Sequence, residues 1–276
     1  MNRRRILQEV AYQMEADLTR GVTHWGEPAW NDAARHFLTP PAPRRQAASA
    51  SPPPAPRKAP TFGPPPAAEG READWERRLQ EVRQDALACR ECGLHKTRQH
   101  VVFDSGSGTV PLLFVGEAPG ADEDAQGEAF VGRAGQLLTK IIAAIGLDRR
   151  EVYISNILKC RPPGNRNPTP EETAACTPFL LRQLEILKPR VICTLGLVAT
   201  QYLLDMKAPI GKLRGRVFRY QGIPLLPTYH PAALLRNPNL KRTVWEDVQL
   251  LRKILDEGIE LPEATEPSKP VSGNLF

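Results

Sequence analysis

The residues best suited to chemistry lie at three separate points of the chain, each at or just after an apolar run. Glu117 follows PLLFVG, Asn156 ends EVYISN, and His230 follows IPLLPTY. A carboxylate can stabilise a cation or orient water, a carboxamide offers a donor and an acceptor side by side, and an imidazole can donate to a developing anion. The three residue types therefore indicate one polar site that both recognises a ligand and acts on it.

The stretch GEAPGADEDAQGEAFVG, residues 116–132, is rich in glycine and acid and has no lysine. A phosphate-binding P-loop needs GxxxxGK[ST] and a dinucleotide fingerprint needs GxGxxG, and the stretch matches neither. A glycine-rich turn can also let the backbone press closely against a flat ligand. Phe130 then either stacks on a base or packs as a core aromatic, and Asp122 to Asp124 are alternatively a solvated helix start.

The cysteines offer a metal site. Cys89 and Cys92 form CRECGL, and Cys160 and Cys176 bracket CRPPGNRNPTPEETAAC. Four thiolates suit a tetrahedral zinc ion or an iron–sulfur cluster, and their spacing alone does not decide between them, although zinc is the more common. A redox-active CxxC pair is the alternative for the first two. Cys193, inside the strand-like VICTLG, is typical of a buried small hydrophobe.

The segment TYHPAALLRNP, residues 228–238, combines His230 with Leu234, Leu235 and Arg236 on a predicted loop between two prolines. Leucines beside an arginine are a pattern of apolar wedges that proteins insert into distorted DNA. The alternatives are that both leucines pack into the domain and that His230 is structural.

Strand and helix patterns alternate from about residue 73. Apolar runs at 111–117, 151–156, 190–196 and 217–230 predict strands, and helical patterns precede Cys89 and cover 135–147, 169–187 and 243–258. Thr169 and Glu172 form a capping box at the start of one helix. We expect a three-layer α/β/α sandwich around a central, mostly parallel, four-stranded sheet. In such sheets ligands bind at the carboxyl ends of the strands, where Glu117, Asn156 and His230 all fall.

The ends of the chain differ from this middle part. Residues 1–72 are predicted to be an extension with a short helix and a disordered proline-rich linker, 73–260 the folded domain, and 261–276 a flexible tail. The final SGNLF is either a loose terminus or a short peptide that docks in a partner, similar to sliding-clamp ligands. The net charge of +6 favours an anionic partner, and no apolar run is long enough to span a membrane. We expect a cytoplasmic monomer.

Four of the motifs together resemble the iron–sulfur, family 4 uracil-DNA glycosylases. They are CRECGLHKTRQHVVFDSG, VGEAPGADEDAQGEAFVGRAGQLL, YISNILKCRPPGNRNPTPEETAAC and HPAALLRNP, within residues 75–257. The resemblance implies a base excision repair enzyme that flips uracil out of DNA and hydrolyses its N-glycosidic bond, leaving an abasic site. We also expect nucleoid association, and the termini are candidate contacts for a sliding clamp or other repair proteins.

The resemblance assigns roles residue by residue. A [4Fe–4S] cluster would be held by Cys89, Cys92, Cys160 and Cys176. The uracil pocket would be lined by Glu117, Ala118, Pro119, Phe130, Asn156 and His230. Glu117 and His230 are the expected catalytic residues, with Glu123 as a second candidate carboxylate, and Leu234, Leu235 and Arg236 would fill the gap that the flipped base leaves in DNA.

Three rival functions remain at this point. A related branch captures the abasic sugar covalently through a histidine in an inserted KRRIH-like loop, and the RPPGNRNPTP that follows Cys160 contains no such insertion. A non-enzymatic iron–sulfur nucleic-acid-binding module would account for the charge and the cysteines but not for Glu117, Asn156 and His230. An unrelated metal-dependent hydrolase would need metal ligands beyond the four cysteines.

Overall fold

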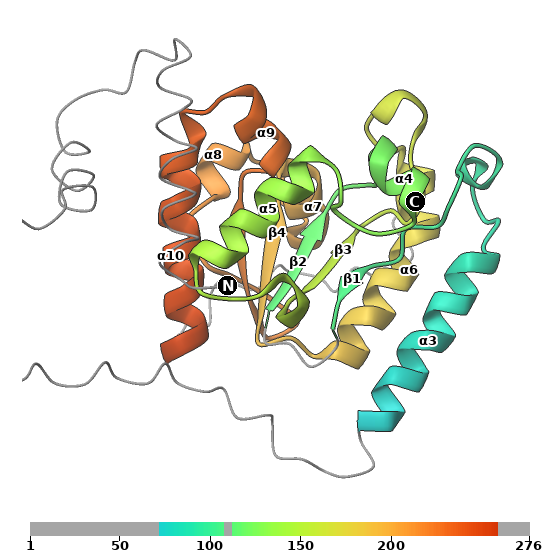
Figure 1. Cartoon of the computed structure of the whole chain (residues 1–276), viewed down its shortest axis with the longest axis horizontal. Coiled ribbons are helices and arrows are strands. Elements are labelled where there is room, and N and C mark those ends of the chain that lie inside the picture. Colours follow the sequence, from blue (N-terminus) through green and yellow to red (C-terminus); the bar gives the residue numbers. More distant parts are fainter. Residues whose placement is uncertain (1–71, 108–111, 259–276) are drawn as a thin grey trace, which may run out of the picture. The chain divides into compact units, whose positions relative to one another are not determined.

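The computed structural model describes residues 72–107 and 112–258, which form a sheet covered by helices on both faces (Figure 1). The strands are β1 (Ser105–Gly106), β2 (Leu112–Gly116), β3 (Tyr153–Asn156), β4 (Val191–Leu195), β5 (Phe218–Tyr220) and β6 (Ile223–Thr228). Their order across the sheet is β1-β3-β2-β4-β6-β5. The predicted α/β fold is confirmed.

The sheet has six strands, so the prediction of four is corrected. The four central strands β3, β2, β4 and β6 are parallel, as expected, and β1 and β5 add an antiparallel strand at each edge. The edge strands are two and three residues long. Strands this short carry too few residues for an alternating pattern, so β1 could not be recognised from its residues alone.

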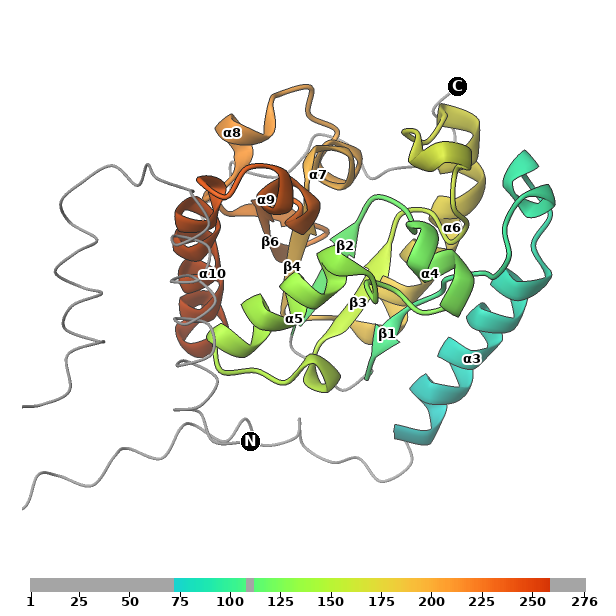
Figure 2. The same ribbon diagram turned by 45° about the horizontal axis from the view of Figure 1, so that its top comes forward.

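The helices divide between the two faces of the sheet (Figures 1 and 2). They are α3 (Glu72–Ala88), α4 (Ala121–Gln126), α5 (Arg133–Ala144), α6 (Pro170–Leu187), α7 (Leu197–Leu204), α8 (Ile210–Leu213), α9 (Pro231–Arg236) and α10 (Leu240–Glu257), with 3₁₀ turns η1 (Gly93–Lys96), η2 (Arg149–Glu151) and η3 (Pro163–Asn165). One apolar cluster joins α3, α6 and α7 to the sheet, and a second joins α5, α9 and α10 to its other face.

The alternation of side chains along β2 explains these two cores. Leu112 and Phe114 pack with α5 and α10, whereas Leu113 and Val115 pack with α3 and α6. All of β2 is buried, as expected for a strand covered on both faces. The three-layer arrangement predicted from the sequence is therefore present.

Local signals set where helices begin. The Thr169 hydroxyl accepts from the Glu172 backbone N–H at 3.2 Å, and the Glu172 carboxylate accepts from the Thr169 N–H at 2.9 Å. This is the predicted capping box, followed by Pro170 at the first helical position. The cap fixes the start of α6, and two turns later the Cys176 sulfur accepts from the Lys159 backbone N–H in the segment after β3.

The order of the strands reverses direction at β2. The chain leaves β2 and returns through α5 to β3 on one side, then crosses through α6 to β4 on the other side of β2. The loops after β2 and β3 diverge at this point, because their crossover helices lie on opposite faces. Open α/β sheets bind ligands at such a reversal of strand order.

The described residues belong to one compact unit of the chain. The predicted extension, its linker and the C-terminal SGNLF lie outside the described residues, and the domain boundaries stay predictions. None of the helices in the described ranges is long and apolar enough to cross a membrane.

Candidate functional site

The ends of β2 and β3 bring a glycine, a carboxamide and an aromatic ring to one point. Gly116 and Asn156 are paired neighbours in the parallel ladder. A Cβ on Gly116 would overlap the Asn156 Oδ1 atom and lie 2.7 Å from the Phe130 ring, so only glycine fits there. Asn156 is 1% exposed, and its Oδ1 has no hydrogen-bond partner. A buried acceptor left unpaired costs about 1–3 kcal/mol, so it calls for a donor from a ligand.

The position of Phe130 is held by the backbone around it. Phe130 has a φ of 57°, an unfavourable conformation for a bulky residue. The Arg149 guanidinium donates to the Ala129 carbonyl at 2.6 Å, just before the ring, and also to the Ser105 hydroxyl. Strain of this kind persists where the surroundings over-determine it, which is common at functional sites.

His230 lies across from this ring. Its imidazole centroid is 5.5 Å from that of Phe130, and the ring planes are tilted by 32°. The Ala232 backbone N–H donates to the His230 Nδ1 at 3.1 Å, so a neutral ring carries its proton on Nε2. Burial lowers the pKa of His230 to about 4, assisted by the Arg236 charge. At neutral pH the residue is therefore an uncharged Nε2–H donor.

The two candidate carboxylates differ in their surroundings. Glu117 is half-buried directly after β2, and burial raises its pKa above the ordinary value. Its neighbours Ala118 and Pro119 continue the same loop, partly and fully buried. Glu123 instead accepts from the Gly120 N–H at 3.1 Å and the Gly132 N–H at 2.9 Å. Glu123 thus ties the two glycine turns together and holds the loop in place.

The histidine segment is not the predicted loop. Residues 231–236 form the helix α9, capped by His230. Leu234 is 2% exposed and packs in the core, whereas Leu235 is 41% exposed and Arg236 is exposed. The prediction of a double-leucine wedge is therefore corrected, because a helix turns its successive residues to different sides and only Leu235 faces outward.

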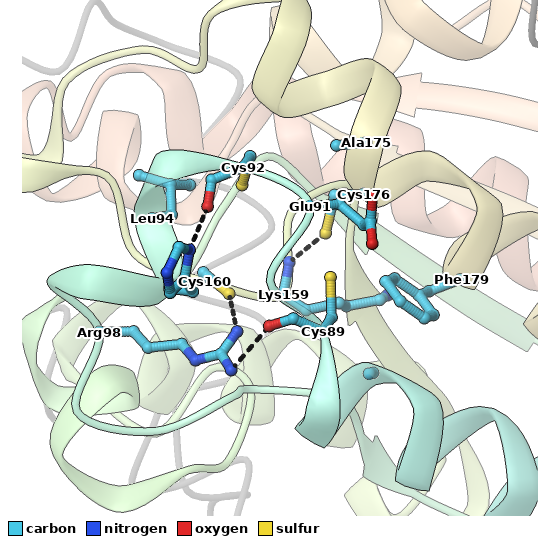
Figure 3. Close-up of a pocket in the computed structure, with 12 residues that line it drawn as sticks. Cys89, Glu91, Cys92, Leu94, Arg98, Lys159, Cys160, Ala175, Cys176 and Phe179 are labelled. Atoms are coloured by element: carbon cyan, nitrogen blue, oxygen red, sulfur yellow. Dashed lines mark hydrogen bonds between the residues drawn. The ribbon is translucent and has the colours of Figure 1, made fainter.

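The four predicted thiol ligands line one pocket (Figure 3). Cys89 follows α3, Cys92 precedes η1, Cys160 follows β3 and Cys176 lies on α6. Two N–H groups point at their sulfur atoms: Arg98 Nη1 donates to Cys160 Sγ at 3.2 Å, and the Lys159 backbone N donates to Cys176 Sγ at 3.1 Å. Cys193 is buried within β4 and does not line this pocket.

The donor set of this pocket fits an iron–sulfur cluster. Thiolates are the usual ligands of such clusters, and N–H donors to the sulfur atoms are a usual accompaniment. Among the described residues, no three His, Cys, Asp or Glu side chains converge on a single metal ion. The thiolates of a [4Fe–4S] cluster bind different irons, so these ligands need not converge on one point. Burial raises the pKa of Cys176 to about 12, so a thiolate there needs a positive partner.

Two residues near the site were not predicted from the sequence. Lys159 looked like part of the apolar stretch ISNILKC, yet it is buried and touches Asn156. Burial lowers its pKa to about 8, opposed first by Cys176. Arg149 stood in an unremarkable connection between α5 and β3. A lone charge inside an apolar run was the available signal for Lys159, and no local signal distinguished Arg149.

Comparisons with known proteins show the family of the chain. Residues 103–249 match the model of the uracil DNA glycosylase superfamily. The chain is 43% identical over 184 residues to a type-4 uracil-DNA glycosylase of Archaeoglobus fulgidus, covering 64% of this chain and 92% of the relative. It is 46% identical over 171 residues to a type-4 enzyme of Thermotoga maritima, covering 60% and 89%. A type-5 uracil-DNA glycosylase of Pyrobaculum aerophilum is 31% identical over 160 residues, covering 51% and 70%. The chain belongs to the uracil DNA glycosylase superfamily and, within it, to the type-4 uracil-DNA glycosylases.

Proposed function

We propose that the protein is a monofunctional uracil-DNA glycosylase: it removes uracil from DNA by hydrolysing the N-glycosidic bond and leaves the strand uncut. The observation that carries this proposal is the unpaired Oδ1 of the buried Asn156, which lies beside the Phe130 ring. Uracil is flat and offers an N3–H donor next to its O4 acceptor. A base within a duplex is out of reach of such a buried group, so it must be flipped out.

Recognition of uracil then follows from the carboxamide. The Asn156 oxygen accepts from N3–H, and its amide donates to O4. Cytosine offers the opposite pattern at these two positions and would leave buried groups unpaired, at about 1–3 kcal/mol each. Phe130 would stack on the flipped base. Glu117, Ala118 and Pro119 form the adjoining wall, and we propose that Glu117 with this backbone excludes the thymine methyl group.

Cleavage of the bond separates charge, and the site offers a partner for each sign. The departing uracil gains negative charge at O2, where the His230 Nε2–H can donate. The sugar gains positive charge, which the Glu117 carboxylate can stabilise while it orients the attacking water. Because Glu123 is engaged by Gly120 and Gly132, we assign it a positioning role in place of the catalytic role predicted as a second choice.

We further propose that Cys89, Cys92, Cys160 and Cys176 hold a [4Fe–4S] cluster. When bound, it would supply structural cross-linking of four segments and no chemistry to the bond cleavage. Support comes from the shared pocket and from the two N–H donors to sulfur.

A cysteine pair tests the cluster. Replacing Cys176 by serine is expected to lower the iron bound per chain and the visible absorbance of the protein, because a cluster ligand is lost. Cys193→Ala is the matched control, since that thiol is also buried but lies outside the pocket. Equal iron content in the two variants would contradict the ligand assignment.

Substitutions of two adjacent leucines test the proposed contact of α9 with DNA. Leu235→Ala is expected to slow uracil excision from double-stranded DNA with little loss of stability, because this side chain is exposed. Leu234→Ala should instead cost about 2–5 kcal/mol of the free energy of unfolding, as for other buried leucines. Excision rates on duplex DNA and denaturant unfolding of both variants check this, and unchanged duplex excision in Leu235→Ala would remove the wedge role.

The base selectivity is tested by product analysis. Oligonucleotides carrying uracil, thymine or cytosine at one position are incubated with the protein, and released free base is identified by chromatography. We expect uracil alone. Release of a nucleotide, or of thymine at a comparable rate, would contradict the proposed pocket.

A further inference from the structure

Lys159 is the only lysine with a buried side chain in the described ranges of the chain, at 1% exposure. Its ammonium donates to Ser155 Oγ at 2.7 Å, to the Asn156 carbonyl at 2.8 Å and to Gln183 Oε1 at 2.7 Å. These three bonds use all three N–H donors of an ammonium. Burying a charge costs several kcal/mol unless it is paired and hydrogen-bonded, so the placement needs a reason.

Neutral oxygens accept all three bonds, and the neighbouring carboxylate is engaged elsewhere. Asp104 bonds to Arg83 and to the Tyr153 hydroxyl. The ammonium also lies over the Phe103 ring, 5.6 Å from its centroid. The buried cation is therefore held by neutral acceptors and an aromatic ring.

The same residue touches both sites of the protein. Its backbone N–H donates to Cys176 Sγ, and its ammonium returns three residues to the Asn156 carbonyl. Cys160, the next residue, is itself a wall of the pocket (Figure 3). Five consecutive residues, 156–160, thus carry the base-reading carboxamide at one end and the thiol pocket at the other.

We propose that Lys159 is a positioning residue that links the thiol pocket to uracil recognition. Its ammonium fixes the peptide of Asn156, so the orientation of the Asn156 carboxamide depends on the segment that holds the cysteines. The inference rests on the proposed function of that carboxamide. On this proposal the four-cysteine pocket affects uracil recognition as well as stability, because a change in the pocket would displace the Asn156 carboxamide.

The test compares Lys159→Met, which keeps the length of the side chain without its charge or donors, with wild type and with Lys140→Met. Lys140 is exposed on α5 and serves as the matched control. Four quantities are measured on the full chain: folded fraction by circular dichroism, iron per chain, affinity for free uracil by equilibrium dialysis, and the single-turnover excision rate per folded molecule.

We expect Lys159→Met to lose roughly 10- to 100-fold in both free-uracil affinity and excision rate, since misplacement by about 1 Å has effects of this size. Its affinity for uracil-free DNA should match that of wild type, as should all properties of Lys140→Met. A lower folded fraction with normal uracil affinity and normal rate per folded molecule would mean a merely structural role and would overturn the proposal.

A second variant keeps the proposal testable if Lys159→Met does not fold. Gln183→Glu has the same shape and places a carboxylate on the ammonium, which should draw it away from the Asn156 carbonyl. We expect weaker free-uracil binding with iron content retained, and unchanged binding would overturn the proposal. Failure of wild type to release uracil would count against the proposed function instead, because the Lys159 comparison is made on uracil affinity as well as on rate.

Discussion

Replacing Asn156 by aspartate should lower the rate of uracil excision by about 100-fold or more. The change keeps the shape of the side chain but removes the donor to uracil O4, and it places a carboxylate against that oxygen. Two unfavourable polar contacts at about 1–3 kcal/mol each give a loss of this order. The single-turnover rate on a uracil-containing strand is the measurement, made with enzyme in excess so that DNA affinity does not limit it.

The ratio of uracil to cytosine excision provides the control for Asn156→Asp. An aspartate carboxylate offers acceptors only. The amino group of cytosine therefore no longer faces the amide donor of Asn156, and the ratio of uracil to cytosine excision rates should fall. This ratio does not depend on how much of the variant is folded. A variant that keeps the wild-type rate and the wild-type preference would exclude Asn156 as the reader of the base.

Replacing His230 by alanine should lower the single-turnover rate by a factor of about 10²–10³. This is the usual effect of removing one hydrogen-bond donor to a developing oxyanion. His100→Ala is the matched control, because His100 is exposed and its ring contacts the Asp124 carbonyl in α4. Retention of the full rate in His230→Ala would remove the residue from the mechanism.

The pH dependence adds a second check on His230. Its pKa is lowered to about 4 by burial, so the ring stays neutral between pH 6 and 8. The wild-type rate should therefore show no titration of this histidine in that range. A rate that fell as pH rose through 6.5 would mean that the charged imidazole is the active form, against the tautomer fixed by Ala232.

Much of the fold followed from the sequence because long elements carry repeated signals. The apolar face of α5 recurs over several turns, and the buried run of β2 spans a whole strand. The start of α6 carries a capping box, which is a specific local signal. The edge strand β1 could not be predicted in this way, because two residues cannot show a period. Its pairing with β3 depends on residues far apart in the sequence.

The sequence predicted which residues gather at the site better than it predicted what each of them does there. Asn156 and His230 lie near each other because they follow parallel strands that end at one edge of the sheet. Phe130 reaches the same place from the turn between α4 and α5. The burial of Leu234 and the backbone contacts of Glu123 depend on how α9 and the glycine turns pack, which local pattern does not specify. Lys159 was hidden for the same reason, since its partners come from β3 and α6.

The central claim is best tested on one end-labelled strand that carries a single uracil, incubated with the protein in the presence of EDTA. Half of the sample is then heated in alkali, and both halves are separated on a denaturing gel. The account predicts a break at the uracil position only after alkali, because the enzyme leaves an intact strand with an abasic site. A break without alkali, a protease-sensitive band of slow mobility, or a strand that stays intact after alkali would each contradict it.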